Sequence, residues 1–174
     1  MAILKFVSKW SDPNYFEQSF VNVIESTVHI VQQTLTMCSH LDMDNHNILV
    51  IGTTAAHKHR IYPKALESLG LKVLAVEDAE QRVIQQGIDH IKEGNLEKGG
   101  QVIVDAVRSK IENSTHVIMG CSEITLAVKR EHVHRVKDDV MFIDTTELMA
   151  QSVAAWLVMQ NQRYKWVQNS FCGG

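Results

Sequence analysis

The sequence predicts an α/β fold in which a four-stranded parallel sheet is flanked by helices. Three observations point to it. Four short apolar runs with the length and composition of buried strands occur along the chain. Segments with apolar residues at helical spacing separate these runs, as in βαβ units with right-handed crossovers. The 174 residues, of which 45% are hydrophobic, are enough for one packed domain with an attached arm.

Residues 1–47 are expected to form an N-terminal arm with one long helix. Ser11, Asp12 and Pro13 have the pattern of an N-cap followed by proline in the first turn. Apolar residues then recur at helical spacing as far as about Cys38. They are Phe16, Phe20, Val23, Ile24, Val28, Ile30, Val31 and Leu35. The polar segment 41–47 suits an exposed loop that leads into the sheet.

Residues 48–145 carry the four expected strands and form the parallel α/β lobe. Each strand is a short, mainly apolar run, which is typical of a strand buried on both faces. The strands are expected at Ile48–Gly52, Lys72–Val76, His116–Gly120 and Val140–Ile143.

The expected helices are bounded by recognisable residues. Gly70 and Gly94 follow two of them, at the position that favours a left-handed residue. Thr145 or Thr146 is expected to cap the last helix, so that residues 146–174 form a C-terminal helix and tail. The helices are expected at His57–Leu69, Ala79–Lys92, Leu96–Ile111 and Thr125–Lys129, and from 146 to about Gln162.

A polar cluster follows each expected strand. Parallel strands end at one edge of the sheet, and ligands of open α/β sheets bind outside that edge. Hydroxyls and backbone N–H groups at helix starts can hold a carboxylate, although Thr and Ser there are also ordinary caps. The clusters are Thr53-Thr54, Glu77-Asp78, Cys121-Ser122-Glu123 and Asp144-Thr145-Thr146.

Cys121 is the candidate reactive group. It stands between the third expected strand and the following helix, whose positive end favours a thiolate over a thiol. A thiolate in that place can act as a nucleophile or as a proton carrier. Cys38 is interpreted as a small core or boundary residue, and Cys172 as a free thiol in the tail.

Charge and composition argue against several classes of protein. Seventeen Lys and Arg face twenty Asp and Glu without a long block of either sign, so no nucleic-acid or membrane partner is predicted. No apolar stretch reaches the roughly 20 residues that span a bilayer. Lys5, Lys9 and Asp12 interrupt any signal-peptide core, and a cytoplasmic protein is expected. The three cysteines lack CxxC spacing, and His132 and His134 lack a further ligand at suitable spacing, so no metal is expected.

Three segments resemble successive signatures of the aspartate/glutamate racemase family. They are Ile51–Tyr62 (IGTTAAHKHRIY), Gly120–Ile124 (GCSEI) and Ile143–Ala150 (IDTTELMA). A Gly-Cys-Thr/Ser-Glu segment followed by an Asp-Ser/Thr-Thr strand end is fairly specific in this order. The resemblance runs from about Phe20 to Leu157 and implies a flavodoxin-like lobe.

The resemblance implies racemisation of an amino acid without pyridoxal phosphate or any other cofactor. In the family, two cysteines face each other across the α-carbon of the substrate, one as the base and the other as the acid. Cys121 matches the second of them. The resemblance makes Tyr62 and the polar residues around Cys121 candidate substrate contacts, namely Thr53, Thr54, Ser122, Glu123 and Thr145.

The chain departs from the family in two respects. Residues 1–47 contain no segment like the first cysteine motif, so the chain looks like the second of two lobes together with the final helix. Ala56 replaces the second threonine of a Thr-x-x-Thr motif that begins at Thr53. An open lobe exposes apolar surface, and we therefore expect a homodimer or a partner chain that supplies the missing lobe.

Two alternatives to a racemase remain open. A one-cysteine enzyme akin to the decarboxylases of the same superfamily needs only Cys121 and a closed pocket. A catalytically inactive remnant would keep the ligand-binding edge or serve as an interaction domain. An open edge fits the inactive remnant better than either enzyme, because water at such an edge weakens thiolate catalysis.

Overall fold

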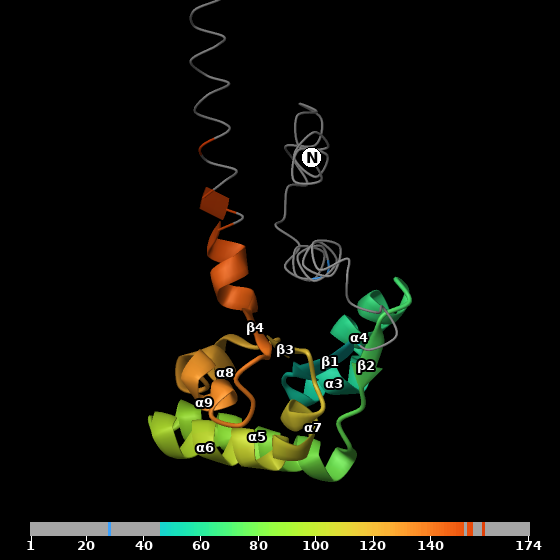
Figure 1. Ribbon diagram of the computed structural model, residues 1–174. Helices are drawn as coiled ribbons and strands as arrows, with labels where there is room; N and C mark the ends of the chain where they lie inside the picture. Colours follow the sequence, from blue (N-terminus) through green and yellow to red (C-terminus); the bar gives the residue numbers. More distant parts are fainter. Residues whose placement is uncertain (1–27, 29–45, 152, 155–157, 159–174) are drawn as a thin grey trace, which may run out of the picture. The chain divides into compact units, whose positions relative to one another are not determined.

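The computed structural model describes residues 28, 46–151, 153, 154 and 158 (Figure 1). Contacts divide the chain into two units, and the sheet belongs to the unit Val23–Leu148. The expected helix of the N-terminal arm lies outside the described residues except for Val28, which is helical. Cys38 and Cys172 also lie outside them.

Four parallel strands form the sheet, as predicted. Their order is β2-β1-β3-β4, so β1 and β3 are central. The register places Ile48 of β1 beside Val73 of β2 and beside His116 of β3. The strands are β1 (Asn47–Ile51), β2 (Lys72–Leu74), β3 (His116–Met119) and β4 (Met141–Asp144).

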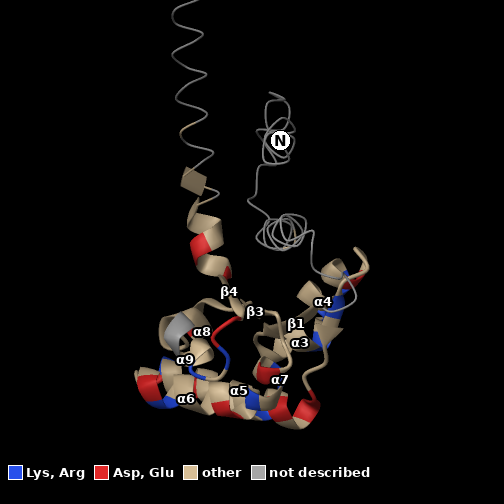
Figure 2. Ribbon diagram, in the orientation of Figure 1, with Lys and Arg blue, Asp and Glu red and all other residues tan. Residues whose placement is uncertain are grey.

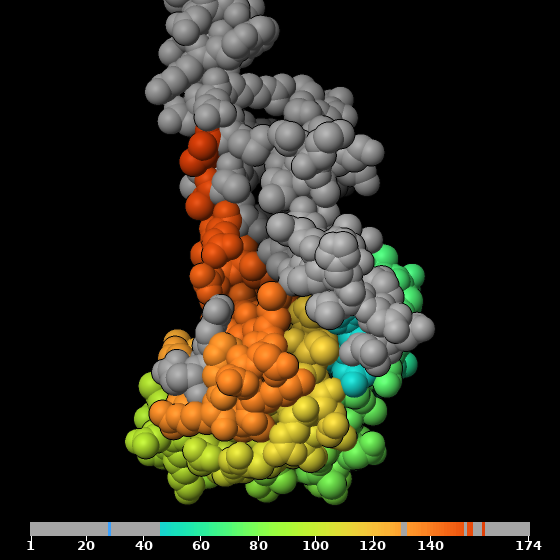
Figure 3. All heavy atoms as spheres, viewed as in Figure 1, coloured from blue at the N-terminus to red at the C-terminus, as the bar shows by residue number. Residues whose placement is uncertain are grey.

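Helices that follow the strands cover the first face of the sheet. Long α5 and α6 lie side by side beneath it, and α8 and α9 pack against them (Figures 1 and 3). The core of this layer joins Leu49, Val117 and Met119 of the strands to Ile84 and Ile103 of the helices. The helices are α5 (Asp78–Lys92), α6 (Leu96–Ala106), α7 (Arg108–Glu112), α8 (Ser122–Ala127) and α9 (Arg130–His134).

A smaller apolar cluster covers the second face. Tyr62 and Leu66 of α4 (Ile61–Glu67) pack there against Ile48 and Ile118. Val28 and Leu148 also pack against this cluster, from segments that precede β1 and follow β4.

The expected helix His57–Leu69 is wrong as a single element. The structure has α3 (Thr54–His59) and α4, separated by Arg60, whose φ of 50° is left-handed. Pro63 explains the break, because proline has no N–H to donate to the carbonyl four residues earlier and its ring clashes with that carbonyl. The first helix therefore ends at His59.

The expected helix Leu96–Ile111 is also divided, at Val107, into α6 and α7. Gly99 and Gly100 lie within α6 without interrupting it. Because they have no side chain, they allow the backbones of neighbouring helices to approach closely. A β-carbon on Gly99 would lie 2.6 Å from the carbonyl oxygen of Gly87 in α5, and one on Gly100 would lie 2.7 Å from that of Ala127 in α8. The pair therefore fixes the packing of three helices.

The remaining boundaries differ by a few residues. The helix expected at Thr125–Lys129 begins earlier, directly after Cys121, and α9 is an additional helix that contains His132 and His134. The helix after β4 begins at Thr145. Asp144 caps it rather than Thr145 or Thr146, because its Oδ1 accepts from the backbone N–H groups of Thr146 (2.8 Å) and Glu147 (3.2 Å).

Charges of both signs are interspersed along α5 and α6 (Figure 2). Among the described residues, no helix combines the length and the apolar character that a membrane crossing requires.

Candidate functional site

The four predicted polar clusters follow the carboxyl ends of the four strands in the structure. Each cluster lies at the end of a strand and at or beside the start of the next helix, namely α3, α5, α8 and the helix after β4. Because the strands are parallel, these starts share one edge of the sheet.

Cys121 lies at the N-cap position of α8 with an extended backbone. It is 7% exposed and belongs to the core of the first face. Its thiol donates a hydrogen bond of 2.9 Å to Oε2 of Glu123, and the hydroxyl of Ser122 donates to the same oxygen at 3.0 Å. One carboxylate therefore holds both side chains that precede it.

The protonation state of Cys121 differs from the sequence prediction. Burial raises the pKa of its thiol, and the hydrogen bond to the Glu123 carboxylate raises it further. The backbone N–H groups of Ile124 and Glu123 lie close enough to lower this pKa, but by less, and the sulfur makes no capping hydrogen bond. The helix start thus favours the thiolate as expected, but burial and Glu123 outweigh this effect, and the resting group is a thiol.

The pKa of the Glu123 carboxyl is shifted in the opposite direction, below its usual value. The hydrogen bond from Cys121 is the largest cause that lowers the pKa of Glu123, followed by its own backbone and by Ser122. Glu123 is therefore anionic at neutral pH and serves as the acceptor for the thiol.

Thr145 has a structural partner. Its side chain is buried, and its hydroxyl donates a 2.6 Å hydrogen bond to the carbonyl oxygen of Met119. This bond ties the start of the last helix to the end of β3. The hydroxyl of the neighbouring Thr146 lies 3.3 Å from that of Thr125 in α8.

The two threonines after β1 have different surroundings. Thr53 is the N-cap of α3, and its hydroxyl accepts from the backbone N–H of Ala56 at 3.2 Å. Thr54 is exposed, and both its N–H (3.3 Å) and its hydroxyl (3.0 Å) donate to Oε1 of Gln85 in α5. Capping accounts for Thr53, whereas Thr54 lines a cavity.

That cavity of about 660 Å³ lies at the carboxyl ends of β1 and β2. Thr54 and Tyr62 are the two predicted site residues that line it, and Cys121, Thr53, Ser122, Glu123 and Thr145 are not in its wall. The structure thus divides the predicted site into a thiol cluster at α8 and a cavity beside β2. The rest of the wall is Val50, Gly52, Ala56, His57, Lys58, Arg60, Pro63, Glu67, Val73, Leu74, Ala75, Val76, Asp78, Gln81 and Arg82.

The two parts meet at Gly120. A β-carbon on Gly120 would lie 2.8 Å from the ring of Tyr62, so this ring packs directly against the backbone that precedes Cys121. The buried side chain of Gln81 adds a second link, because its amide donates to the carbonyl oxygen of Gly52 at 3.1 Å. The cavity wall is therefore built on the strand ends that also position the thiol.

Cationic groups predominate among the unpaired side chains of the cavity. Arg60 forms an ion pair with Glu67 (2.6 Å), and His57 lies 3.4 Å from Asp78. Lys58 and Arg82 line the wall, and neither forms an ion pair within the part of the chain that the structure describes. An anionic group of a ligand would compensate these two charges.

Sequence reasoning missed Arg82 and did not single out Lys58. Arg82 is in the first turns of α5, and Lys58 is in α3. The available signal was the polar cluster Glu77-Asp78, which marks the start of α5 at the same edge as Thr54. His57 also lines the cavity, whereas His59 does not. Within the described residues, no group of three or more His, Cys, Asp or Glu side chains could hold a metal ion.

Comparison with known proteins identifies relatives over most of the chain. The family model for Asp/Glu/hydantoin racemases matches residues 26–153. An uncharacterized protein from the pnlA 3′ region of Pectobacterium carotovorum subsp. carotovorum is 24% identical over 139 residues, which cover 78% of this chain and 88% of that protein.

Solved structures share the fold. An aspartate racemase homologue from Pyrococcus horikoshii OT3 is similar with a TM-score of 0.60 and 25% identity, covering 78% of this chain and 55% of that one. Aspartate racemase from Picrophilus torridus gives a TM-score of 0.62 at 16% identity, covering 82% and 57%. This chain therefore spans little more than half the length of these solved relatives.

Proposed function

Because the chain belongs to the Asp/Glu/hydantoin racemase family, we propose that it acts in the cofactor-independent racemisation of an amino acid and contributes the thiol of Cys121. The observation that carries this proposal is the Cys121 thiol, hydrogen-bonded to an anionic Glu123 at the carboxyl edge of a parallel sheet. Family membership supports the reaction class, and the geometry supports the residue.

The resting thiol suits Cys121 to the role of the acid. In such a reaction, a base on one face of the substrate removes the proton from the α-carbon, and a thiol on the other face returns one. Cys121 would give its proton to the carbanion and become a thiolate, which the reverse reaction reprotonates. Glu123 holds the thiol hydrogen in a fixed direction until transfer.

The cavity supports an acidic amino acid as substrate. Its unpaired Lys58 and Arg82 favour an anionic group, and Tyr62 connects its wall to the backbone beside Cys121. A second carboxylate on the substrate would bind at these cations, while Thr54 offers a hydroxyl in the cavity wall. Aspartate and glutamate are the simplest amino acids of this kind.

A second proton carrier must come from outside this lobe. Cys121 is the free cysteine of the described residues, and the chain spans little more than half the length of its solved relatives. We infer that a second copy of the chain, or a separate chain with the missing lobe, closes the edge and supplies the other acid/base group. The cytoplasmic location stays a prediction from the sequence.

Proton-exchange NMR in deuterated water tests the proposal. With aspartate or glutamate, the protein is expected to replace the α-proton by deuterium, and Cys121→Ala is expected to abolish this exchange. Cys172→Ala is the matched control, because it removes a thiol that the proposal does not use. Exchange that persists in Cys121→Ala contradicts the proposal.

The same measurement separates the alternatives. Exchange accompanied by loss of optical activity indicates racemisation, whereas exchange confined to one enantiomer indicates a one-thiol enzyme. Binding of aspartate without exchange indicates the inactive remnant.

A further inference from the structure

Two buried histidines pack together at the amino edge of the sheet, opposite the candidate site. His46 directly precedes β1, and His116 is the first residue of β3. They are 6% and 5% exposed. Their rings meet edge to face, with centroids 5.9 Å apart and an interplanar angle of 71°.

Both rings lie on the second face of the sheet. Side chains alternate along a strand, so His116 shares the face of Ile118, and His46 continues the row of Ile48. Ile48 and Ile118 belong to the apolar cluster against which Val28 packs. The histidines therefore lie at the amino end of the surface that receives the segment containing Val28.

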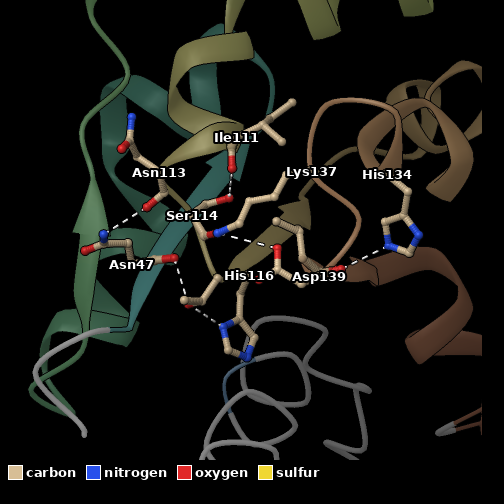
Figure 4. Close-up of polar contacts among 10 residues, drawn as sticks. Asn47, Ile111, Asn113, Ser114, His116, His134, Lys137 and Asp139 are labelled. Carbon is tan, nitrogen blue, oxygen red and sulfur yellow. Dashed lines mark hydrogen bonds and ion pairs between the residues drawn. The ribbon is translucent and has the colours of Figure 1, made fainter. Parts of the chain in front are cut away.

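Several polar groups around His116 have hydrogen-bond partners, although Oδ1 of Asn47 has none among the described residues (Figure 4). The amide of Asn47 donates to the carbonyl oxygen of Asn113 at 2.9 Å, and the hydroxyl of Ser114 donates to that of Ile111 at 2.9 Å. Lys137 donates to the carbonyl oxygen of Ser114 at 2.7 Å. The hydroxyl of Thr115 lies 2.9 Å from Nδ1 of His116.

Three ring nitrogens of the histidine pair lack such partners. Within the described residues, both nitrogens of His46 and Nε2 of His116 are buried without a hydrogen bond. Burying a neutral imidazole without hydrogen bonds costs free energy, and burying an imidazolium with an unpaired N–H costs far more. Protonation of either ring therefore destabilises the packed histidine pair.

No described charged group at this edge forms an ion pair that would stabilise a positive charge on either ring. Burial is the largest cause that lowers the pKa of His116, to about 4, and the second cause is His46. No described carboxylate forms an ion pair with either ring, and Asp139 lies 3.7 Å from Lys137 instead. The charged and titratable side chains on the neighbouring elements include Lys72 of β2, Lys64 and Glu67 of α4, Arg108, Lys110 and Glu112 of α7, His134 of α9, Lys137, Asp138 and Asp139 before β4, Asp144 of β4 and Glu147 after it.

We propose that His46 and His116 form an acid-sensitive latch, which holds the amino ends of β1 and β3 and the packing of Val28 in neutral solution and releases them when a proton enters the pair. The device is separate from Cys121, which lies at the opposite edge of the sheet. Because one strand carries His116 at its start and leads to Cys121 at its end, release would loosen the strand that positions the thiol.

The sign follows from the pKa of His116, which lies below its usual value of 6.5. The unfolded chain takes up the proton first, so stability is complete above that usual value and is lost as the pH falls toward 4. Through His116 alone, the equilibrium constant for unfolding is expected to rise about thirtyfold between pH 7.5 and pH 5.0.

Urea unfolding at these two pH values tests the latch in the full chain. His116→Leu, which cannot take up a proton, is expected to lose most of that thirtyfold change. His46→Leu is expected to reduce this pH-dependent change, because His46 no longer lowers the pKa of His116. His59→Gln removes an exposed histidine and is expected to keep the full change.

Hydrogen exchange supplies a local readout that a general loss of stability would not give. After correction for the intrinsic rate at each pH, amides of β1 and β3 are expected to lose protection at pH 5.0 before those of α5. An equal pH dependence in wild type, His116→Leu and His46→Leu overturns the proposal. A uniform loss of protection across β1, β3 and α5 also overturns it. If one histidine variant does not fold, the other variant and the wild-type exchange pattern still decide.

Discussion

At the scale of single residues, Glu123 determines the state of the candidate thiol. Its carboxylate accepts hydrogen bonds from both Cys121 and Ser122, and its charge opposes ionisation of the sulfur. The sequence predicted the position of Cys121 at a strand end correctly. It could not predict the protonation state, because burial and the direction of one carboxylate decide between the competing effects.

Replacement of this carboxylate has a definite sign. Glu123→Gln is expected to lower the pKa of the Cys121 thiol, because it removes a negative charge and a charged acceptor. The rate of alkylation by iodoacetamide as a function of pH measures this pKa, in a background with Cys38→Ala and Cys172→Ala. Ser122→Ala is the control, since it leaves the carboxylate in place. A pKa that stays unchanged or rises in Glu123→Gln would contradict the assigned role.

At the scale of elements, the strands were predictable and the helix boundaries were less so. Four apolar runs correctly indicated β1 to β4, since strands buried on both faces leave that pattern. Two expected helices are broken, at Arg60 and at Val107. Pro63 was a visible signal for the first break. The second break has no such local signal in the sequence.

The glycines of α6 have a packing role that composition alone could not show. Gly99 lies against the backbone of Gly87 in α5, whereas Gly94 meets no neighbouring atom and has a φ of 90°. Gly99→Ala is expected to cost about 1–3 kcal/mol of unfolding free energy through overpacking at the helix crossing. Gly94→Asn is expected to cost less, because asparagine tolerates a left-handed backbone. Urea denaturation compares the two, and an equal or smaller loss for Gly99→Ala would contradict the close crossing.

In the candidate site, residues within contiguous motifs were predictable from the sequence, whereas residues that only the fold brings together were not. Thr53 and Cys121 were identified from motifs that are contiguous in the sequence. Arg82 was not, because the cavity joins α3 to α5 through the fold rather than through neighbouring residues. Lys58 lies within the Ile51–Tyr62 segment, but nothing in the sequence distinguished it from its neighbours there. Thr145 was predicted as a substrate contact, and its hydroxyl donates to Met119 instead. Only the folded register of β3 and β4 brings that carbonyl within reach.

At the scale of the whole molecule, the lobe is predicted to act as part of an assembly. Leu126 of α8 is 58% exposed, five residues after Cys121. We expect a second copy or lobe that closes the edge to cover this side chain.

Light scattering after gel filtration tests this prediction. The wild-type chain is expected to form a dimer, and Leu126→Asp is expected to shift it toward the monomer. Leu96→Asp changes another exposed leucine, at the start of α6 rather than at the helices that begin at the carboxyl edge of the sheet. It is expected to leave the dimer intact. A wild-type monomer at high concentration argues against self-association and favours a separate partner chain.

The order of the strands has a consequence for synthesis on the ribosome. β1 is central in the sheet but emerges first, and one of its two neighbours is β3. The hydroxyl of Thr115, directly before β3, donates to the carbonyl oxygen of Asn47 across a separation of 68 residues. Until that later segment leaves the exit tunnel, one side of the nascent strand has no native neighbour, and closing so long a loop slows folding. The newborn chain would therefore benefit most from chaperone protection in the interval between β2 and β3.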